Sequence, residues 1–219
     1  MTYKQQFIQF LAECGVLKFG TFKLKSGRIA PYFLNSGEYK TGAQLKKLGE
    51  FYADCMHENG LQADTLFGPA YKGVPLALSA ALALYEKYGQ NVNFCFDRKE
   101  VKDHGEGGIF VGKQPEDGEK IVVIEDVMTS GKALREVLPK LQGAAKVNVA
   151  GMVITVDRME KGLGSERSAV QEAYLEHGVK VYSIVNILDI LQAIEEGVIE
   201  GKEHVSAIRA YLKEYGAQY

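Results

Sequence analysis

Helical and extended patterns alternate in the first sixty residues of the chain. Apolar side chains recur at helical spacing over residues 3–14, and Thr2 is the predicted N-cap of that helix. A second helix is predicted to begin after Thr41 and to end before Gly60. Between the two helices, residues 19–35 contain alternating and aromatic positions that a Ser-Gly pair and a proline interrupt. This segment is predicted to form short strands joined by a turn.

From residue 64 onward, short apolar runs alternate with helical patterns, which is typical of α/β folds. The predicted strands cover residues 65–67, 92–96, 121–124, 147–156 and 179–185. The predicted helices cover residues 73–88, 131–142, 166–177, 187–196 and 203–215. Continuous apolar runs such as residues 121–124 suit strands that are buried on both faces of a parallel sheet. The pattern therefore predicts an α/β fold with a doubly wound, mostly parallel sheet, flanked by helices and preceded by a small N-terminal cap, the hood.

One domain is expected over residues 1–219, because neither an internal repeat nor a low-complexity linker interrupts the pattern. Within it we expect an N-terminal cap and helices over residues 1–60, an α/β core over 61–185 and C-terminal helices over 186–219. Sheets of this kind bind ligands at the carboxyl ends of their strands. The loops that follow the strands are therefore where functional residues are expected.

The charge and composition of the chain argue against several classes of protein. Lys and Arg number 26 against 28 Asp and Glu, a balance of −2, whereas a general nucleic-acid binder would normally carry a basic excess. The 24 glycines make up about 11% of the 219 residues, above the usual share of about 7%, which indicates functional loops. Three cysteines with no Cys-x-x-Cys pair predict neither a disulfide framework nor a zinc site, and they fit a reducing cytoplasm. The longest apolar stretch is too short to span a bilayer, so no membrane partner is expected.

The strongest chemical signal follows the apolar run at residues 121–124. Glu125 and Asp126 come next, and a Thr-Ser-Gly turn then leads into a predicted helix. The N–H groups and hydroxyls of such a turn, with the positive end of the helix dipole, can bind a phosphate. The two carboxylates suit neighbouring ribose hydroxyls or a metal, although a helix-capping turn is the plainer interpretation of an isolated acidic pair. The candidate residues here are Glu125, Asp126, Val127, Met128, Thr129, Ser130, Gly131, Lys132 and Ala133.

A second signal is the charged segment over residues 97–108. Three cations and a histidine are interleaved with acids and followed by three glycines in four positions, which predicts a mobile loop rather than a packed element. A solvated charge run is the ordinary interpretation of such a segment. This one, however, follows a predicted strand and so faces the same sheet edge as the Thr-Ser-Gly turn. Its candidate residues are Arg98, Lys99, Lys102 and His104.

Three weaker signals lie elsewhere along the chain. Residues 67–73 form a glycine-containing turn in which Tyr71 and Lys72 can approach an anion, although an ordinary strand-to-helix turn explains it equally well. Residues 22–35 carry Lys25, Phe33 and Leu34, and a surface hairpin with scattered lysines is the alternative. Arg158 follows another strand, where a guanidinium can bind a carboxylate in a fork, and the alternative is a surface ion pair with Asp157.

Together these motifs resemble the type I phosphoribosyltransferases, and among them the orotate phosphoribosyltransferases. The apolar strand with two acids and a Thr-Ser-Gly turn resembles the family's phosphoribosyl-pyrophosphate motif. The Arg-Lys-x-x-Lys-x-His pattern over residues 98–104 resembles the catalytic loop that closes over pyrophosphate, and residues 67–73 match the pyrophosphate loop. The Leu-Lys-Ser-Gly-Arg and Pro-Tyr-Phe segments over residues 24–33 are similar to the N-terminal segment of the orotate enzymes.

The resemblance implies transfer of a phosphoribosyl group from phosphoribosyl pyrophosphate to N1 of orotate, giving orotidine 5′-monophosphate and pyrophosphate in pyrimidine biosynthesis. It also implies Mg²⁺ held mainly by the substrates, a cytoplasmic enzyme, and a homodimer whose active sites are shared between subunits. The implied pyrophosphate ligands are Lys25, Lys72, Arg98, Lys99 and Lys102, with His104 as a hydrogen-bond donor or acid. Glu125 and Asp126 would hold the ribose, residues 127–133 the 5′-phosphate, and Phe33, Thr129 and Arg158 the orotate.

Three positions depart from the pattern of the orotate enzymes. Glu125 stands where aspartate is common, Leu34 replaces a second aromatic residue, and Lys132 replaces a small residue and either tightens phosphate binding or points to solvent. A phosphoribosyltransferase for another nucleobase therefore stays open as an alternative. A non-catalytic regulator that senses phosphoribosyl pyrophosphate is another, although it would normally bring a basic face or a nucleic-acid-binding module.

Overall fold

The computed structural model of the chain describes residues 1–102 and 108–219, without the side chains of Val101 and Lys102. The predicted site residue His104 lies outside the described residues, and so does the side chain of Lys102.

A sheet of six strands forms the centre of the described part of the chain, in the order β5-β4-β3-β6-β7-β8. The strands are β3 (Thr65–Gly68), β4 (Asn93–Lys102), β5 (Gly108–Gly112), β6 (Lys120–Ile124), β7 (Asn148–Asp157) and β8 (Val181–Asn186). All neighbouring pairs are parallel except β4 and β5, which pair antiparallel at one edge. The prediction of a mostly parallel α/β sheet is thereby confirmed.

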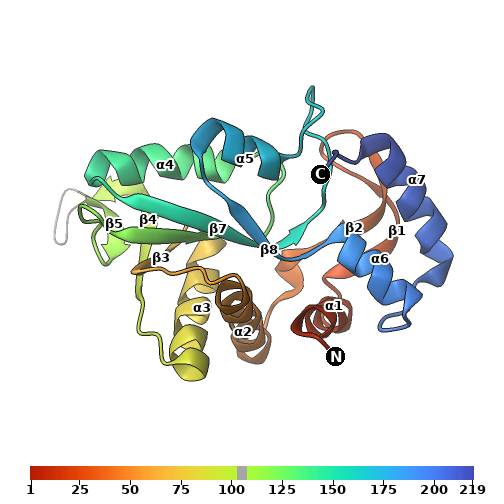
Figure 1. The fold of residues 1–219 in the computed structure, drawn as a ribbon, viewed down its shortest axis with the longest axis horizontal. Coiled ribbons are helices and arrows are strands. Elements are labelled where there is room, and N and C mark those ends of the chain that lie inside the picture. The colour runs from red at the N-terminus through yellow and green to blue at the C-terminus, as the bar shows by residue number, and fades with distance from the viewer. Residues whose placement is uncertain (103–107) are drawn as a thin grey trace.

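Helices cover both faces of the sheet, as Figure 1 shows. One face carries α4 (Lys132–Ala144) and α5 (Ala169–His177), and the other carries α2 (Gly42–Glu58) and α3 (Gly73–Tyr88). Along β6, Ile121 and Val123 belong to the apolar cluster with α4 and α5, whereas Val122 and Ile124 belong to the cluster with α2 and α3. This two-sided burial explains why the sequence of β6 is a continuous apolar run.

The hood lies at one end of the sheet, where the N-terminal and C-terminal parts of the chain meet (Figure 1). Its elements are α1 (Tyr3–Glu13), β1 (Leu17–Lys23), β2 (Ile29–Leu34) and the 3-10 turn η1 (Ser36–Glu38). The C-terminal elements that pack beside it are α6 (Ile187–Glu195), the 3-10 turn η2 (Lys202–His204) and α7 (Val205–Tyr215). The predicted helices are thus present, with ends shifted by a few residues. None of the described helices is long and apolar enough to cross a membrane.

Two details of the predicted strands are wrong. Pro31 does not interrupt the hood hairpin but lies inside β2, opposite an irregularity in the register of β1, where a residue without an N–H group is tolerated. Residues 97–102 are not a loop but the continuation of β4, and Gly108 begins β5. Because this part of β4 extends past the end of β3 and pairs only with β5, its charged side chains are compatible with a strand.

Candidate active site

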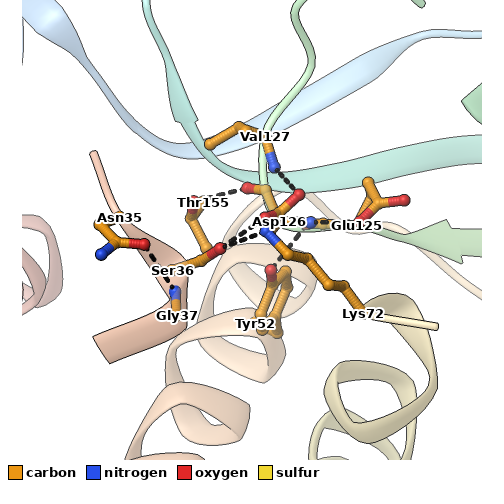
Figure 2. Close-up of polar contacts among 9 residues, drawn as sticks. All are labelled: Asn35, Ser36, Gly37, Tyr52, Lys72, Glu125, Asp126, Val127 and Thr155. Carbon is orange, nitrogen blue, oxygen red and sulfur yellow. Dashed lines mark hydrogen bonds and ion pairs between the residues drawn. The ribbon is translucent and has the colours of Figure 1, made fainter. Parts of the chain in front are cut away.

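Glu125 and Asp126 lie directly after β6, at the carboxyl edge of the sheet. Both are largely buried, with 9% and 8% of their surface exposed. Their backbone carbonyls are fixed from two sides, because the Tyr52 hydroxyl of α2 donates to Glu125 O at 2.7 Å and the Thr155 hydroxyl of β7 donates to Asp126 O at 2.5 Å. Figure 2 shows these contacts converging on the end of the strand. The acidic pair is therefore rigidly placed.

The carboxylate of Asp126 accepts hydrogen bonds from three directions (Figure 2). The Ser36 hydroxyl donates to Oδ2 at 2.6 Å, the Lys72 ammonium donates to the same oxygen at 2.9 Å, and the N–H of Val127 donates to Oδ1 at 2.7 Å. Lys72 also donates to the Ser36 hydroxyl at 3.0 Å. The hood turn η1, the turn after β3 and the end of β6 thus meet at one carboxylate.

The two neighbouring carboxyl groups have pKa values shifted in opposite directions. Burial raises the pKa of Glu125 well above the ordinary carboxyl range, and one N–H donor, that of Asp126 at 2.9 Å, opposes this. Burial also acts to raise the pKa of Asp126, but the hydrogen bonds from Ser36, Lys72 and Val127 outweigh burial and lower it. Near neutral pH the pair therefore consists of a protonated Glu125 and an ionised Asp126, two groups with different chemical capabilities.

Two helices that begin at this edge have N-termini without a side-chain cap. Capping boxes close the N-termini of α1, α2, α5 and α6, at Thr2, Thr41, Ser168 and Asn186. By contrast, α3 begins after Lys72 and α4 begins after Gly131, and no described side chain caps either one. Because α3 follows β3 and α4 follows β6, the neighbour of β3 in the sheet, their first N–H groups and positive dipole ends lie at the edge that carries the acidic pair and can bind anions.

The turn between β6 and α4 is held by its own residues. Gly131 has a φ of 67°, a left-handed conformation that favours glycine, and the Arg135 guanidinium donates to Ser130 O at 2.6 Å. Lys132 is exposed and lies 3.6 Å from the carboxylate of Glu136, along the first turn of the helix. Thr129 and Ser130 are also exposed, as expected for residues that contact a ligand.

The turn after β3 carries exposed Tyr71 and Lys72 above a tightly packed base. A Cβ atom at Gly68 would overlap with the carbonyl of Gly73, so the turn closes this tightly only with glycine. Lys99 of β4 places its ammonium 4.5 Å from the centre of the Tyr71 ring, a cation–π contact. The charged strand and this turn are therefore neighbours, as the prediction of a common anion site requires.

Two of the three predicted orotate residues, Phe33 and Arg158, belong to the hood side of the molecule, whereas Thr129 lies in the turn between β6 and α4. Arg158 donates to Glu160 Oε1 at 2.6 Å, and the Tyr32 hydroxyl of β2 donates to the same oxygen at 2.9 Å. The alternative interpretation of Arg158, a surface ion pair with Asp157, is wrong, because the partner of the guanidinium is Glu160. Phe33 is 38% exposed and stacks on Phe22 at 5.5 Å between ring centres. Arg158 is thus held by Glu160, to which Tyr32 of the hood strand also donates, and not by the Asp126 cluster.

The structure brings Lys72 to Asp126 and Lys99 to Tyr71, whereas Lys25 lies exposed in the hairpin turn between β1 and β2. Sequence reasoning missed Ser36, which contacts both Lys72 and Asp126. Asn35 orients the Ser36 turn, since its side chain accepts the Gly37 N–H at 3.2 Å. A hydroxyl directly after a predicted strand is a weak signal that could have indicated Ser36.

The described residues contain no cluster of three or more His, Cys, Asp or Glu side chains that could hold a metal ion. Asp126 is the one ionised carboxylate of the acidic pair, so the chain contributes little more than a single ligand at this edge. This donor set fits Mg²⁺, which usually binds through one or two carboxylates together with phosphate oxygens of a substrate. It does not fit a metal held by the protein alone.

Comparison with known proteins gives consistent matches over the chain. The phosphoribosyl transferase domain family matches residues 35–177. Orotate phosphoribosyltransferases of Lachnoclostridium phytofermentans and Clostridium botulinum are 45% and 46% identical to this chain, each covering 99% of it and 98% or 99% of the relative. The solved structure of an orotate phosphoribosyltransferase from Francisella tularensis matches with a TM-score of 0.87 at 37% identity, covering 97% of this chain and all of that chain.

The opposite pKa shifts predict a pH-dependent effect of Glu125→Gln on stability. Folded Glu125 keeps its proton above the ordinary carboxyl pKa of about 4.3, so wild-type protein loses stability as pH rises from there to the raised pKa. Glu125→Gln lacks this loss, and we expect its free energy of unfolding to gain on wild type by up to about 1.4 kcal/mol per pH unit within that window. Urea unfolding between pH 5 and 8 measures this difference.

The exposed Glu166 supplies a control, because Glu166→Gln removes a carboxylate from the surface whose partner, Lys161, keeps its charge throughout this pH range. Its difference from wild type should stay nearly constant with pH. A Glu125→Gln difference that is equally flat would contradict a raised pKa for Glu125.

Proposed function

The chain belongs to the orotate phosphoribosyltransferase family, and we propose that the carboxyl edge of its sheet transfers the phosphoribosyl group of phosphoribosyl pyrophosphate to N1 of orotate. The chain is an enzyme, a pentosyltransferase that acts in pyrimidine biosynthesis. The products are orotidine 5′-monophosphate and pyrophosphate. Relatives that are 45% or 46% identical to this chain are named orotate phosphoribosyltransferases, which favours orotate over another nucleobase.

One observation carries the proposal: two uncapped helix N-termini, after neighbouring strands, begin at the sheet edge that carries the acidic pair. Phosphoribosyl pyrophosphate has the matching arrangement, since its ribose lies between a 5′-phosphate and a pyrophosphate. The turn before α4, residues 127–131, suits the 5′-phosphate, and the turn before α3, residues 68–73, suits the pyrophosphate. The carboxyl groups of Glu125 and Asp126 then lie beside the ribose hydroxyls.

The acidic pair contributes to the reaction through its unequal charge. Phosphoribosyl transfer proceeds through an oxocarbenium-like transition state, in which positive charge develops on the ribose. Ionised Asp126 accepts hydrogen bonds from ribose hydroxyls, and its negative charge stabilises the positive charge that develops on the ring. Protonated Glu125 can donate to a ribose oxygen without adding a second negative charge beside the phosphates. The pair thus binds the sugar with one net charge.

Departure of pyrophosphate requires cations where negative charge grows. Lys72 lies at this place but is paired with Asp126. When phosphoribosyl pyrophosphate binds, the Lys72 ammonium therefore leaves the carboxylate and pairs with pyrophosphate oxygens. Lys99 approaches the same turn from β4, whereas the guanidinium of the neighbouring Arg98 donates to the carbonyl of Gly108 in β5 at 3.3 Å. Lys25, Lys102 and His104 complete the proposed set, with His104 as a hydrogen-bond donor or acid to the leaving group. Mg²⁺ would neutralise pyrophosphate charge, held by Asp126 and mainly by substrate oxygens.

Orotate recognition is assigned to the hood side of the edge. The guanidinium of Arg158 is fixed by Glu160 and Tyr32, so it can receive the carboxylate of orotate without first becoming ordered. The partly exposed ring of Phe33 offers an apolar face for the base. Leu34 belongs to the same strand, and Thr129 reaches the base from the phosphate turn.

A homodimer with shared active sites is proposed on the apolar surface between α3 and β4. Leu82, Tyr85 and Phe94 are exposed there by 66%, 62% and 41% and line one groove. Apolar side chains exposed together in this way are typical of an interface with a second protein. Phe94 lies near the start of the strand that continues to Arg98 and Lys99, so a second copy seated on this groove would contact the same strand that carries the proposed catalytic segment.

We also propose that the chain acts in the cytoplasm, where its free cysteines Cys14, Cys55 and Cys95 would stay reduced.

The proposed single folding unit is supported by contacts of α1 with α6 and β8, which join the two ends of the chain to the sheet.

The proposed function predicts loss of orotate absorbance when the protein is supplied with orotate, phosphoribosyl pyrophosphate and Mg²⁺. Uracil, adenine and hypoxanthine serve as control bases and should give no product. Turnover of another base without turnover of orotate would refute the substrate assignment. Binding of phosphoribosyl pyrophosphate without turnover of any base would point to the regulator instead.

The shared site predicts complementation between two inactive variants. Lys102→Ala lacks a residue of the charged segment and Asp126→Ala lacks the ribose carboxylate, so each should be inactive alone. After subunit exchange, random mixing should restore roughly a quarter of wild-type activity, because half of the dimers carry one intact site of two. Each variant carried through the same exchange alone is the control. Heterodimers that are confirmed by mass spectrometry but remain inactive would exclude a site shared in this way.

A further inference from the structure

Asp97 is a buried carboxylate at the edge of the proposed site to which the reaction assigns no role. Its surface is 5% exposed. Oδ1 accepts the N–H of Ala70 at 2.9 Å, and Oδ2 pairs with the ammonium of Lys140. Both oxygens therefore have donors, and these donors come from two segments distant in sequence.

The position of Asp97 joins the three segments assigned to the donor substrate. Asp97 directly precedes Arg98 and Lys99 on β4. Ala70 lies in the turn over residues 68–73, beside Tyr71 and Lys72, and Lys140 lies on α4, whose first turn follows the phosphate-binding residues. A single side chain thus links the charged strand, the pyrophosphate turn and the phosphate helix.

The charge of this link matters for binding an anion. A neutral side chain such as asparagine could accept the Ala70 N–H equally well, so the hydrogen bond alone does not require an aspartate. A buried carboxylate next to a pyrophosphate-binding turn would repel the ligand unless a cation neutralises it. Lys140 is that cation, because it pairs with the Asp97 oxygen that Ala70 leaves free.

We propose that Asp97 and Lys140 form a positioning pair, in which Asp97 holds the pyrophosphate turn through Ala70 and Lys140 cancels the charge of Asp97. The inference rests on the proposed function for the assignment of pyrophosphate to residues 68–73. Neither side chain needs to contact the substrate. A pair that served only the stability of the fold would affect all ligands alike, whereas a positioning pair affects ligands that carry pyrophosphate.

Two ligands of the proposed reaction separate these cases. Phosphoribosyl pyrophosphate and orotidine monophosphate share the ribose 5′-phosphate, but only the former carries a pyrophosphate. Dissociation constants for both ligands, and for pyrophosphate alone, are measured by calorimetry with Mg²⁺ present. The variants are Lys140→Met, Asp97→Asn, the double variant, and Lys140→Arg, which keeps the charge.

We expect Lys140→Met to weaken the binding of phosphoribosyl pyrophosphate and of pyrophosphate about tenfold, because the charge of Asp97 is left unpaired. The dissociation constant of orotidine monophosphate should change by less than about twofold. Adding Asp97→Asn should restore affinity to within about threefold of wild type, because the unpaired charge is removed while the Ala70 acceptor is kept. Lys140→Arg should bind as wild type. This reversal by a second mutation is not expected from a loss of stability.

The pair between Lys87 and Asp54 supplies a matched control. It too joins a partly exposed lysine to a largely buried aspartate, but it links α2 to α3 away from the proposed site. Lys87→Met should leave all three affinities within about twofold of wild type. Thermal unfolding of every variant shows whether the fold is intact.

Equal weakening of phosphoribosyl pyrophosphate and orotidine monophosphate binding in Lys140→Met, unchanged binding of both, or no recovery in the double variant would each overturn the inference. Wild-type protein that binds neither phosphoribosyl pyrophosphate nor orotidine monophosphate would overturn the proposed function and the inference with it. Wild-type protein that binds both, while Lys140→Met binds them as wild type does, would overturn the inference alone.

Discussion

The burial of two adjacent carboxyl groups at the end of β6 is the constraint on which the site depends. Taking one carboxylate out of water is costly, and two neighbouring charges would add mutual repulsion. The chain meets this cost unequally: Ser36, Lys72 and the Val127 N–H all donate to Asp126, while Glu125 keeps a single backbone donor. One group is therefore ionised while its neighbour stays neutral.

Satisfying Asp126 also assembles the rest of the site. Its side-chain donors come from η1 of the hood and from the turn before α3, so the same hydrogen bonds that stabilise Asp126 also hold the hood at the substrate edge. Tyr52 and Thr155 fix the backbone of the pair from α2 and β7. The same arrangement stabilises Lys72 near the place where a pyrophosphate would need it. Stability without substrate and readiness for substrate thus rest on shared contacts.

Much of this could be predicted from the sequence because it depends on short-range patterns. The apolar run, acidic pair and Thr-Ser-Gly turn specify strand β6 and the start of α4 within a dozen residues. Ser36 and the pairing of Asp97 with Lys140 could not be predicted, since their partners are 90 and 43 residues away. The extension of β4 to Lys102 escaped prediction because its charged residues resemble a loop, and Arg158 found Glu160 rather than its neighbour Asp157.

The central claim is that an ionised Asp126 beside a neutral Glu125 serves the transfer of the phosphoribosyl group. Comparing kcat/KM for Glu125→Gln and Asp126→Asn at neutral pH tests it most directly, because each amide mimics the protonated form of the acid it replaces. We expect the kcat/KM of Glu125→Gln to stay within about threefold of wild type and that of Asp126→Asn to fall about a hundredfold. Equal losses in the two variants, or a larger loss in Glu125→Gln, would contradict it.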